Sequence, residues 1–193
     1  CRIAGATEER RVPVFDWPRV QEAGRLAPWR QLAGNVERFP FLVLDPDGHR
    51  VCVPPGHWRI DQDLVLPAGM TLRCGEGTVL DLVQNALILC RGPLDLCGSR
   101  EHPIVIQSSD HTGQGMVVVD AGGRSQCSWV EWSGLAFPRR EGLGLTGSLT
   151  FYESPLTLTS CTIADNHAED ALNAVRTDVV LTDCTFRRTS NDA

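Results

Sequence analysis

From residue 51 onward, the chain alternates apolar and polar residues in short segments. Segments such as "TVLDL", "ALIL", "PIVI" and "MVVV" are rich in Val, Leu, Ile and Thr, which is typical of β-strands. Turn-forming stretches such as "VPPGH", "LPAGM" and "CGSRE" separate them, and they follow one another too closely to leave room for helices. The pattern therefore predicts an all-β protein built from many short strands.

The strand segments recur with a period of about 23 residues. When "YESPLTLTSCTI" is set over "VRTDVVLTDCTF", Leu158 aligns with Leu181 and Cys161 with Cys184. The same kind of interval, 22 and then 23 residues, separates Cys52, Cys74 and Cys97. Self-similarity at such a period indicates a solenoid. Three short strands per turn, each paired with its equivalent in the next turn, predict a parallel β-helix.

We expect five coils and the start of a sixth, at residues 51–69, 70–93, 94–126, 127–155, 156–178 and from 179 onward. The longer third and fourth coils absorb loops at residues 108–115 and 137–148. Long loops on one side of a solenoid often build its binding face. Because the sequence stops within a coil at Ala193, we expect the natural protein to continue.

Residues 1–50 do not follow the period and are predicted to form an N-terminal cap on the β-helix of residues 51–193. Asp16 and Gly24 mark the start and end of one short helix, and Pro28 and Gly34 mark those of a second. A cap is required because the end strands of a solenoid are otherwise open edges. Four aromatic residues are expected to pack over the first coil: Trp17, Trp29, Phe39 and Phe41.

The runs "PPGHWRIDQDLVLPAGMTL", "GTVLDL", "CRGPLDLCGS" and "SLTFYESPLTLTSCTIADNHAEDALN" resemble right-handed parallel β-helix proteins of the pectin lyase-like superfamily. Within it, the chain is most similar to bacterial extracytoplasmic β-helix proteins of unassigned activity. The resemblance covers residues 51–193 and implies a right-handed coil and a carbohydrate ligand. It also implies either an enzyme, such as a polysaccharide lyase or glycoside hydrolase, or a structural or adhesive module.

The sequence departs from the enzyme patterns of that superfamily. It contains Glu169-Asp170 and Asn191-Asp192 but no Gly-His-Gly, which polygalacturonase-type hydrolases combine with paired acids. It also lacks a local signature of the acidic calcium cluster and basic residue found in pectate-lyase-type sites. Whether the protein is an enzyme therefore stays open, and the alternative is a non-catalytic surface or scaffold β-helix.

Charge and composition limit the classes of partner that we expect this protein to bind. The net charge of −6 is spread among interspersed acidic and basic residues, unlike the basic stripe that nucleic acid requires. No run of apolar residues is long enough to span a bilayer. We expect a monomeric, extracytoplasmic protein whose partner is a polysaccharide or cell-surface glycan. Cys1 is either a lipid-bearing first residue or a fragment boundary. The eight cysteines lack zinc-site spacing and are interpreted as small apolar fillers of the interior.

Two similar stretches, "CTIADNHAEDA" and "CTFRRTSNDA", place Asp170 and Asp192 at equivalent positions of successive coils. We expect these two carboxylates to be neighbours, with Glu169 and His167 close by, and these four are the candidate catalytic residues. Further candidates for ligand binding are Asn166, Asn173, Tyr152, Glu153 and Arg187.

Three interpretations of this acidic corner remain open. Asp and Asn tolerate the left-handed conformation of tight corners, so the repetition can be structural. Alternatively, Asp170 and Asp192 bind Ca²⁺ together with carbonyl and water oxygens. In the third interpretation the two carboxyls form an acid–base pair, with His167 as a proton carrier.

Overall fold

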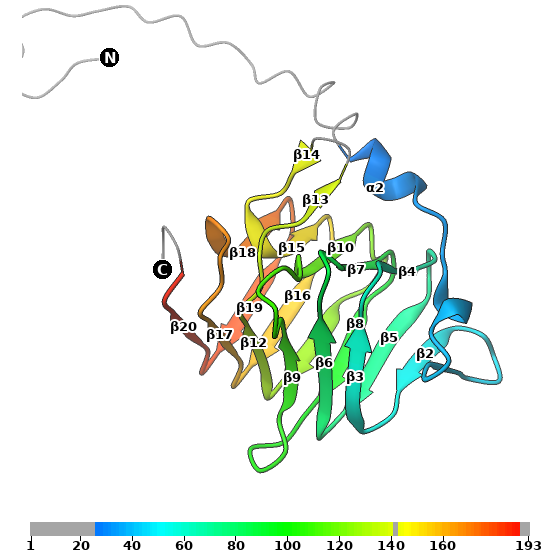
Figure 1. Cartoon of the computed structure of the whole chain (residues 1–193), viewed down its shortest axis with the longest axis horizontal. Helices are drawn as coiled ribbons and strands as arrows, with labels where there is room; N and C mark the ends of the chain where they lie inside the picture. Colours follow the sequence, from blue (N-terminus) through cyan, green and yellow to red (C-terminus); the bar gives the residue numbers. More distant parts are fainter. Residues whose placement is uncertain (1–25, 141–142, 190–193) are drawn as a thin grey trace, which may run out of the picture.

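The computed structural model describes residues 26–140 and 143–189. They form an all-β parallel solenoid of about six coils (Figure 1). Each of the first five coils contributes one strand to each of three sheets, named A, B and C in the order in which the chain visits them, and the described part of the sixth coil contributes β19 to sheet A and β20 to sheet B. The predicted fold class is therefore confirmed. The candidate site lies at one of the corners between these sheets.

Sheet A consists of β1 (Val43–Leu44), β2 (Arg50–Val53), β5 (Thr71–Gly75), β8 (Leu94–Cys97), β11 (Ser125–Ser128), β16 (Leu156–Thr159) and β19 (Val179–Thr182). Sheet B consists of β3 (Gly56–Ile60), β6 (Thr78–Leu82), β9 (Ile104–Gln107), β12 (Val130–Ser133), β17 (Thr162–Ala164) and β20 (Thr185–Arg187). Sheet C consists of β4 (Leu64–Leu66), β7 (Ile88–Cys90), β10 (Met116–Val119), β15 (Gly147–Tyr152) and β18 (Asp170–Val175). All pairings within the three sheets are parallel except that of β1 with β2.

The register confirms the repeat read from the sequence. Leu158 lies opposite Leu181, and Thr162 lies opposite Thr185. Alternate side chains of each strand point inward, where Leu, Ile and Val stack into one continuous core. Cysteines occupy some of these interior positions as expected: Cys74, Cys90, Cys127 and Cys161 are buried and free.

In the fourth, fifth and sixth coils, the corner between sheets A and B turns within one or two residues. Trp129, Ser160 and Asp183 occupy it in successive coils, with φ angles of 52°, 53° and 52°. Trp129 is exposed, whereas Trp132, three residues later, is buried in the core. The bend at the left-handed Trp129 accounts for this difference between the two side chains. The left-handed conformation therefore repeats at this corner, although the residue type does not.

The N-terminal segment covers two different surfaces. The 3₁₀-helix η1 (Val36–Arg38) leads into Phe39, which is buried in the main core, and Phe41 stacks on Trp58 with ring centroids 4.8 Å apart. These two aromatic residues close the end of the first coil, as predicted. The helix α2 (Ala27–Gln31) also forms as predicted, whereas the helix expected between Asp16 and Gly24, and Trp17 within it, lie outside the described residues.

The expected position of Trp29 was wrong. Its side chain is fully buried, but against the outer face of sheet C, where it joins Val65, Leu89 and Val117 in a second apolar cluster. The reason is that sheet C presents apolar residues on both faces, so its outer face also requires a cover. None of the helices in the described ranges is long and apolar enough to cross a membrane.

Candidate functional site

The corner between sheets B and C carries the long loops of the solenoid. In the third, fourth and fifth coils it consists of residues 108–115, 134–146 and 165–169. The three segments are joined by backbone hydrogen bonds, from the Ala136 N–H to the Gly113 carbonyl and from the His167 N–H to the Leu135 carbonyl, both at 2.7 Å. This stacking turns loops that are far apart in sequence into one continuous surface.

The loop of residues 108–115 is held by the carboxylate of Asp110. This carboxylate accepts hydrogen bonds from the Gln84 N–H, from the Ser108 hydroxyl, and from both the N–H and the hydroxyl of Thr112. Partial burial favours the neutral acid, but these hydrogen bonds outweigh it and lower the pKa of Asp110 to about 2. The network supports His111, which adopts a φ of 60°.

The loop of residues 134–146 contains the hairpin of β13 (Arg139–Arg140) and β14 (Leu143–Gly144). The Arg140 guanidinium forms an ion pair with Asp63 of the first coil and donates a hydrogen bond to the Asn85 carbonyl at 3.0 Å. At the other end of the loop, the Asn173 amide donates to the Thr146 hydroxyl at 2.6 Å. The hairpin is thereby fastened across the end of sheet C.

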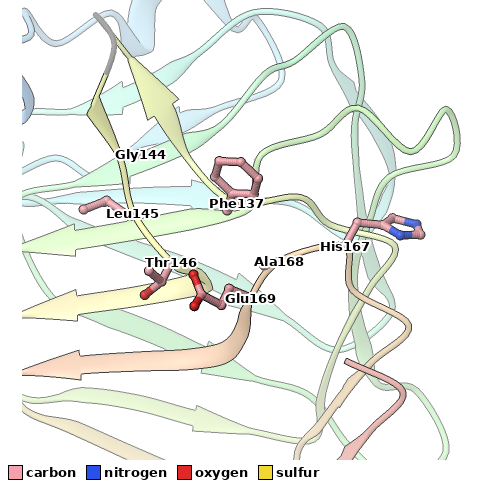
Figure 2. A pocket seen from close by; sticks show the side chains of 7 residues that line it. All are labelled: Phe137, Gly144, Leu145, Thr146, His167, Ala168 and Glu169. Carbon is pink, nitrogen blue, oxygen red and sulfur yellow. The ribbon is translucent and has the colours of Figure 1, made fainter. Parts of the chain in front are cut away.

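A pocket of about 550 Å³ opens between this loop and the fifth coil. Its lining residues are Phe137, Gly144, Leu145, Thr146, His167, Ala168 and Glu169. Figure 2 shows the Glu169 carboxylate and the Thr146 hydroxyl beside each other, with the Phe137 ring above them. The imidazole of His167 points away from this group. The pocket thus combines apolar surface with one carboxylate and one hydroxyl.

Two smaller hollows continue the pocket along the corner. One, of about 350 Å³, lies on the other side of His167 and is lined also by His111 and Asp165. The other, of about 260 Å³, is bounded by Phe137, Arg139 and His111. The three hollows adjoin one another at His111, His167 and Phe137, and we refer to them together as the groove.

The candidate catalytic residues fall into different positions. Glu169 and His167 line the pocket, and Glu169 is exposed. Asp170 is half-buried, begins β18 opposite Gly147, and donates its N–H to the Thr146 carbonyl at 3.1 Å. Asp170 is therefore a strand residue and not a left-handed corner residue. Asp192 lies outside the described residues, and so does its expected contact with Asp170.

In the fifth coil, the residue that occupies a left-handed position at this corner is Asp165, with a φ of 56°. Its carboxylate forms an ion pair with Arg188, which has a φ of 51° in the next coil, and this guanidinium lowers the pKa of Asp165. The structural interpretation of repeated polar corners thus applies to Asp165. Within residues 26–140 and 143–189, no group of three or more His, Cys, Asp or Glu side chains is placed to hold a metal ion.

The candidate ligand-binding residues do not converge on the pocket. Asn166 is buried and hydrogen-bonds the Leu135 N–H and the Ser148 hydroxyl. Arg187 is exposed and lies opposite Ala164 in sheet B. Asn173 is half-buried and approaches the pocket only through its hydrogen bond to Thr146.

Tyr152 and Glu153 lie at the opposite end of sheet C, at its corner with sheet A. The guanidinium groups of Arg30 and Arg176 each lie 5.7 Å from the centroid of the Tyr152 ring. Glu153 forms ion pairs with both arginines, and Arg30 also pairs with Asp120 at 2.6 Å. These contacts fasten α2 to the solenoid, so this corner has a structural role.

Sequence reasoning missed Phe137, Thr146 and His111 as members of the site. The repeat supplies no signal for them, because they lie in loops that interrupt the period. The sequence does not indicate that His111 and His167 meet, yet their rings contact each other edge to face with centroids 5.5 Å apart. Loop length is the one feature of the sequence that pointed to these residues, because the two longest coils place their extra residues at the same corner.

Comparison with known proteins adds no assignment. No family model matches the chain. No curated protein and no solved structure matches it either. The protein is a parallel β-solenoid. The groove at the corner of sheets B and C is the feature that bears on its function.

Proposed function

We propose that this protein binds a carbohydrate chain in the groove at the corner of sheets B and C. The observation that carries the proposal is the pocket of about 550 Å³, whose lining includes the Phe137 ring together with the side chains of Glu169 and Thr146. Aromatic and aliphatic side chains contact the apolar faces of sugar rings, while carboxylate and hydroxyl groups hydrogen-bond their hydroxyls. Such a combination is typical of small-molecule sites with a few placed polar groups.

The course of the groove supports a linear ligand. Its walls come from the third, fourth and fifth coils, and equivalent strands of successive coils stack about 4.8 Å apart. A chain that lies along the solenoid axis would contact more than one of these hollows. This agrees with the resemblance to the pectin lyase-like superfamily, and with an extracytoplasmic location in which polysaccharides are encountered.

We favour binding over catalysis as the role of this groove. An acid–base mechanism needs two titratable groups directed at one bond. His167 points away from Glu169 in Figure 2, and Asp170 is not among the lining residues. The hydrolase or lyase hypothesis therefore requires at least one further titratable group besides these three.

The test is affinity electrophoresis and calorimetry of the purified protein against a panel of neutral, amino and acidic polysaccharides. We expect at least one to bind, and Phe137→Ala to weaken binding at least about tenfold, which corresponds to about 1.4 kcal/mol. Trp129→Ala is the matched control, because Trp129 is an exposed aromatic residue at the corner of sheets A and B. Absence of binding to every polysaccharide, or equal effects of the two variants, contradicts the proposal.

The same samples decide between binding and catalysis. Unsaturated products and new reducing ends are followed with and without Ca²⁺. We expect neither to accumulate. Turnover that Glu169→Gln abolishes would replace the binding function with an enzymatic one.

A further inference from the structure

The charge that the pocket offers to a ligand is negative. Two of its lining residues are ionisable, Glu169 and His167, and the imidazole of His167 is directed away from the Glu169 carboxylate (Figure 2). Across residues 26–140 and 143–189, Glu169 has no cationic side chain within salt-bridge distance. Its carboxylate is exposed and thus remains available to a ligand.

Two arginines of the loops around this corner are already engaged in ion pairs. Arg140 is paired with Asp63, and Arg188 is paired with Asp165. Arg139 lies over the Phe137 ring, with its guanidinium carbon 4.7 Å from the centroid, and lines the neighbouring hollow instead of this pocket. No guanidinium belongs to the described lining of the pocket, so an anionic ligand would meet the Glu169 carboxylate without compensation.

We propose that this pocket selects a sugar that carries a protonated amino group. The inference rests on the proposed carbohydrate-binding function and names the class of sugar. The ammonium group donates charge-assisted hydrogen bonds to the Glu169 carboxylate and a further hydrogen bond to the Thr146 hydroxyl. Phe137 contacts the apolar face of the sugar ring. An acidic sugar is rejected, because two like charges would be brought together in a partly desolvated pocket.

The experiment measures, by calorimetry, the binding of four oligosaccharides and one amine at mildly acidic pH and low salt. The oligosaccharides are those of glucosamine, N-acetylglucosamine, glucose and galacturonic acid, and the amine is spermidine, which has the charge but no sugar ring. The glucosamine and N-acetylglucosamine oligosaccharides share one backbone. The nitrogen is a protonated amine in the first and an uncharged acetamide in the second. We expect the glucosamine oligosaccharide to bind at least about tenfold more tightly than its acetylated counterpart, as for one charge-assisted hydrogen bond.

Glu169→Gln keeps the shape of the side chain and removes its charge. We expect this variant to lose the preference for the amine while retaining residual binding through Phe137. The matched control is Glu131→Gln, an exposed carboxylate on the outer face of β12, which should leave the preference unchanged. Added salt should weaken the glucosamine complex of the native protein more than that of Glu169→Gln.

The outcomes separate this inference from the function on which it rests. Equal or tighter binding of neutral, acetylated or acidic oligosaccharides overturns the amino-sugar preference but leaves carbohydrate binding in place. Spermidine that binds as tightly as glucosamine oligosaccharides also overturns the inference, because charge alone would then explain the affinity. If no oligosaccharide binds, the proposed function itself fails.

Discussion

The imidazole rings of His111 and His167 contact each other edge to face, with their centroids 5.5 Å apart. His111 belongs to the loop of the third coil and His167 to the corner of the fifth coil. Both residues line the hollow that continues the main pocket. The contact therefore joins two loops into one wall of the groove, and its geometry depends on how each loop is held.

The Asp110 carboxylate holds the loop that presents His111, and both of its oxygens accept hydrogen bonds. An amide has only one acceptor oxygen. Asp110→Asn is therefore expected to destabilise the protein by about 1 kcal/mol at neutral pH. The pKa of Asp110 is about 2 in the folded protein and about 3.9 in an unfolded chain. Its contribution to stability is thus present above about pH 4 and is lost as the pH falls towards 2. Urea denaturation across this range should show the native protein and the variant converging.

A matched control for Asp110 is Asp183→Asn, an exposed carboxylate at the corner of sheets A and B. It should change stability by less than about 0.5 kcal/mol. A constant difference between native protein and Asp110→Asn at all pH values would contradict the assigned role of the carboxylate.

Arg140→Ala is expected to loosen the hairpin of β13 and β14, because the ion pair with Asp63 and the hydrogen bond to the Asn85 carbonyl are both lost. The pair is partly buried, so the cost should be about 1–2 kcal/mol. Hydrogen exchange read by mass spectrometry should show faster exchange in peptides covering residues 137–146. The control is Arg139→Ala, at the exposed neighbouring position, which should leave the exchange of these peptides unchanged. If the peptides exchange at similar rates in both variants, the ion pair does not fasten the hairpin.

Trp29→Ala is expected to destabilise the protein by about 3–5 kcal/mol, as for other truncations of a buried aromatic side chain. Trp29 is fully buried against the outer face of sheet C although it lies outside the coils. Urea denaturation measures the change, with Leu44→Ala as an exposed apolar control that should cost less than about 0.5 kcal/mol. A loss below about 1 kcal/mol for Trp29→Ala would mean that α2 does not cover this face in solution.

Thiol labelling should distinguish the interior from the surface. Burial raises the pKa of Cys74, Cys90 and Cys127 above the ordinary range and that of Cys161 to about 11. These thiols should resist maleimide in the folded protein, because the thiolate is the reactive form. Exposed Cys97 should be labelled. Its own pKa is raised by partial burial and by the hydrogen bond to Asp95, so Asp95→Asn should accelerate labelling.

Peptide mapping after labelling in native buffer and in urea provides the comparison for each cysteine. All of these thiols should react once the protein is unfolded. Rapid labelling of Cys90 or Cys127 under native conditions would contradict their place in the interior ladders.

The sequence by itself determined the architecture of this protein. Strand pairing between coils is a local and repeated relationship, so the interval between Cys161 and Cys184 or between Leu158 and Leu181 specifies which residues stack. Inward positions are likewise determined by the strand period of two, which placed Cys74 and Cys127 in the core. The cap residues Phe39 and Phe41 followed from the need to close the first coil.

Only the tertiary structure decided the composition of the candidate site. Its residues lie in loops whose lengths differ from coil to coil, so the repeat cannot align His111 with His167, or Phe137 with Glu169. The position of Trp29 on sheet C depended in the same way on a long-range apolar contact. A repeating backbone specifies its own stacking, whereas an inserted loop is positioned by the particular side chains that it meets, such as Asp63 for Arg140.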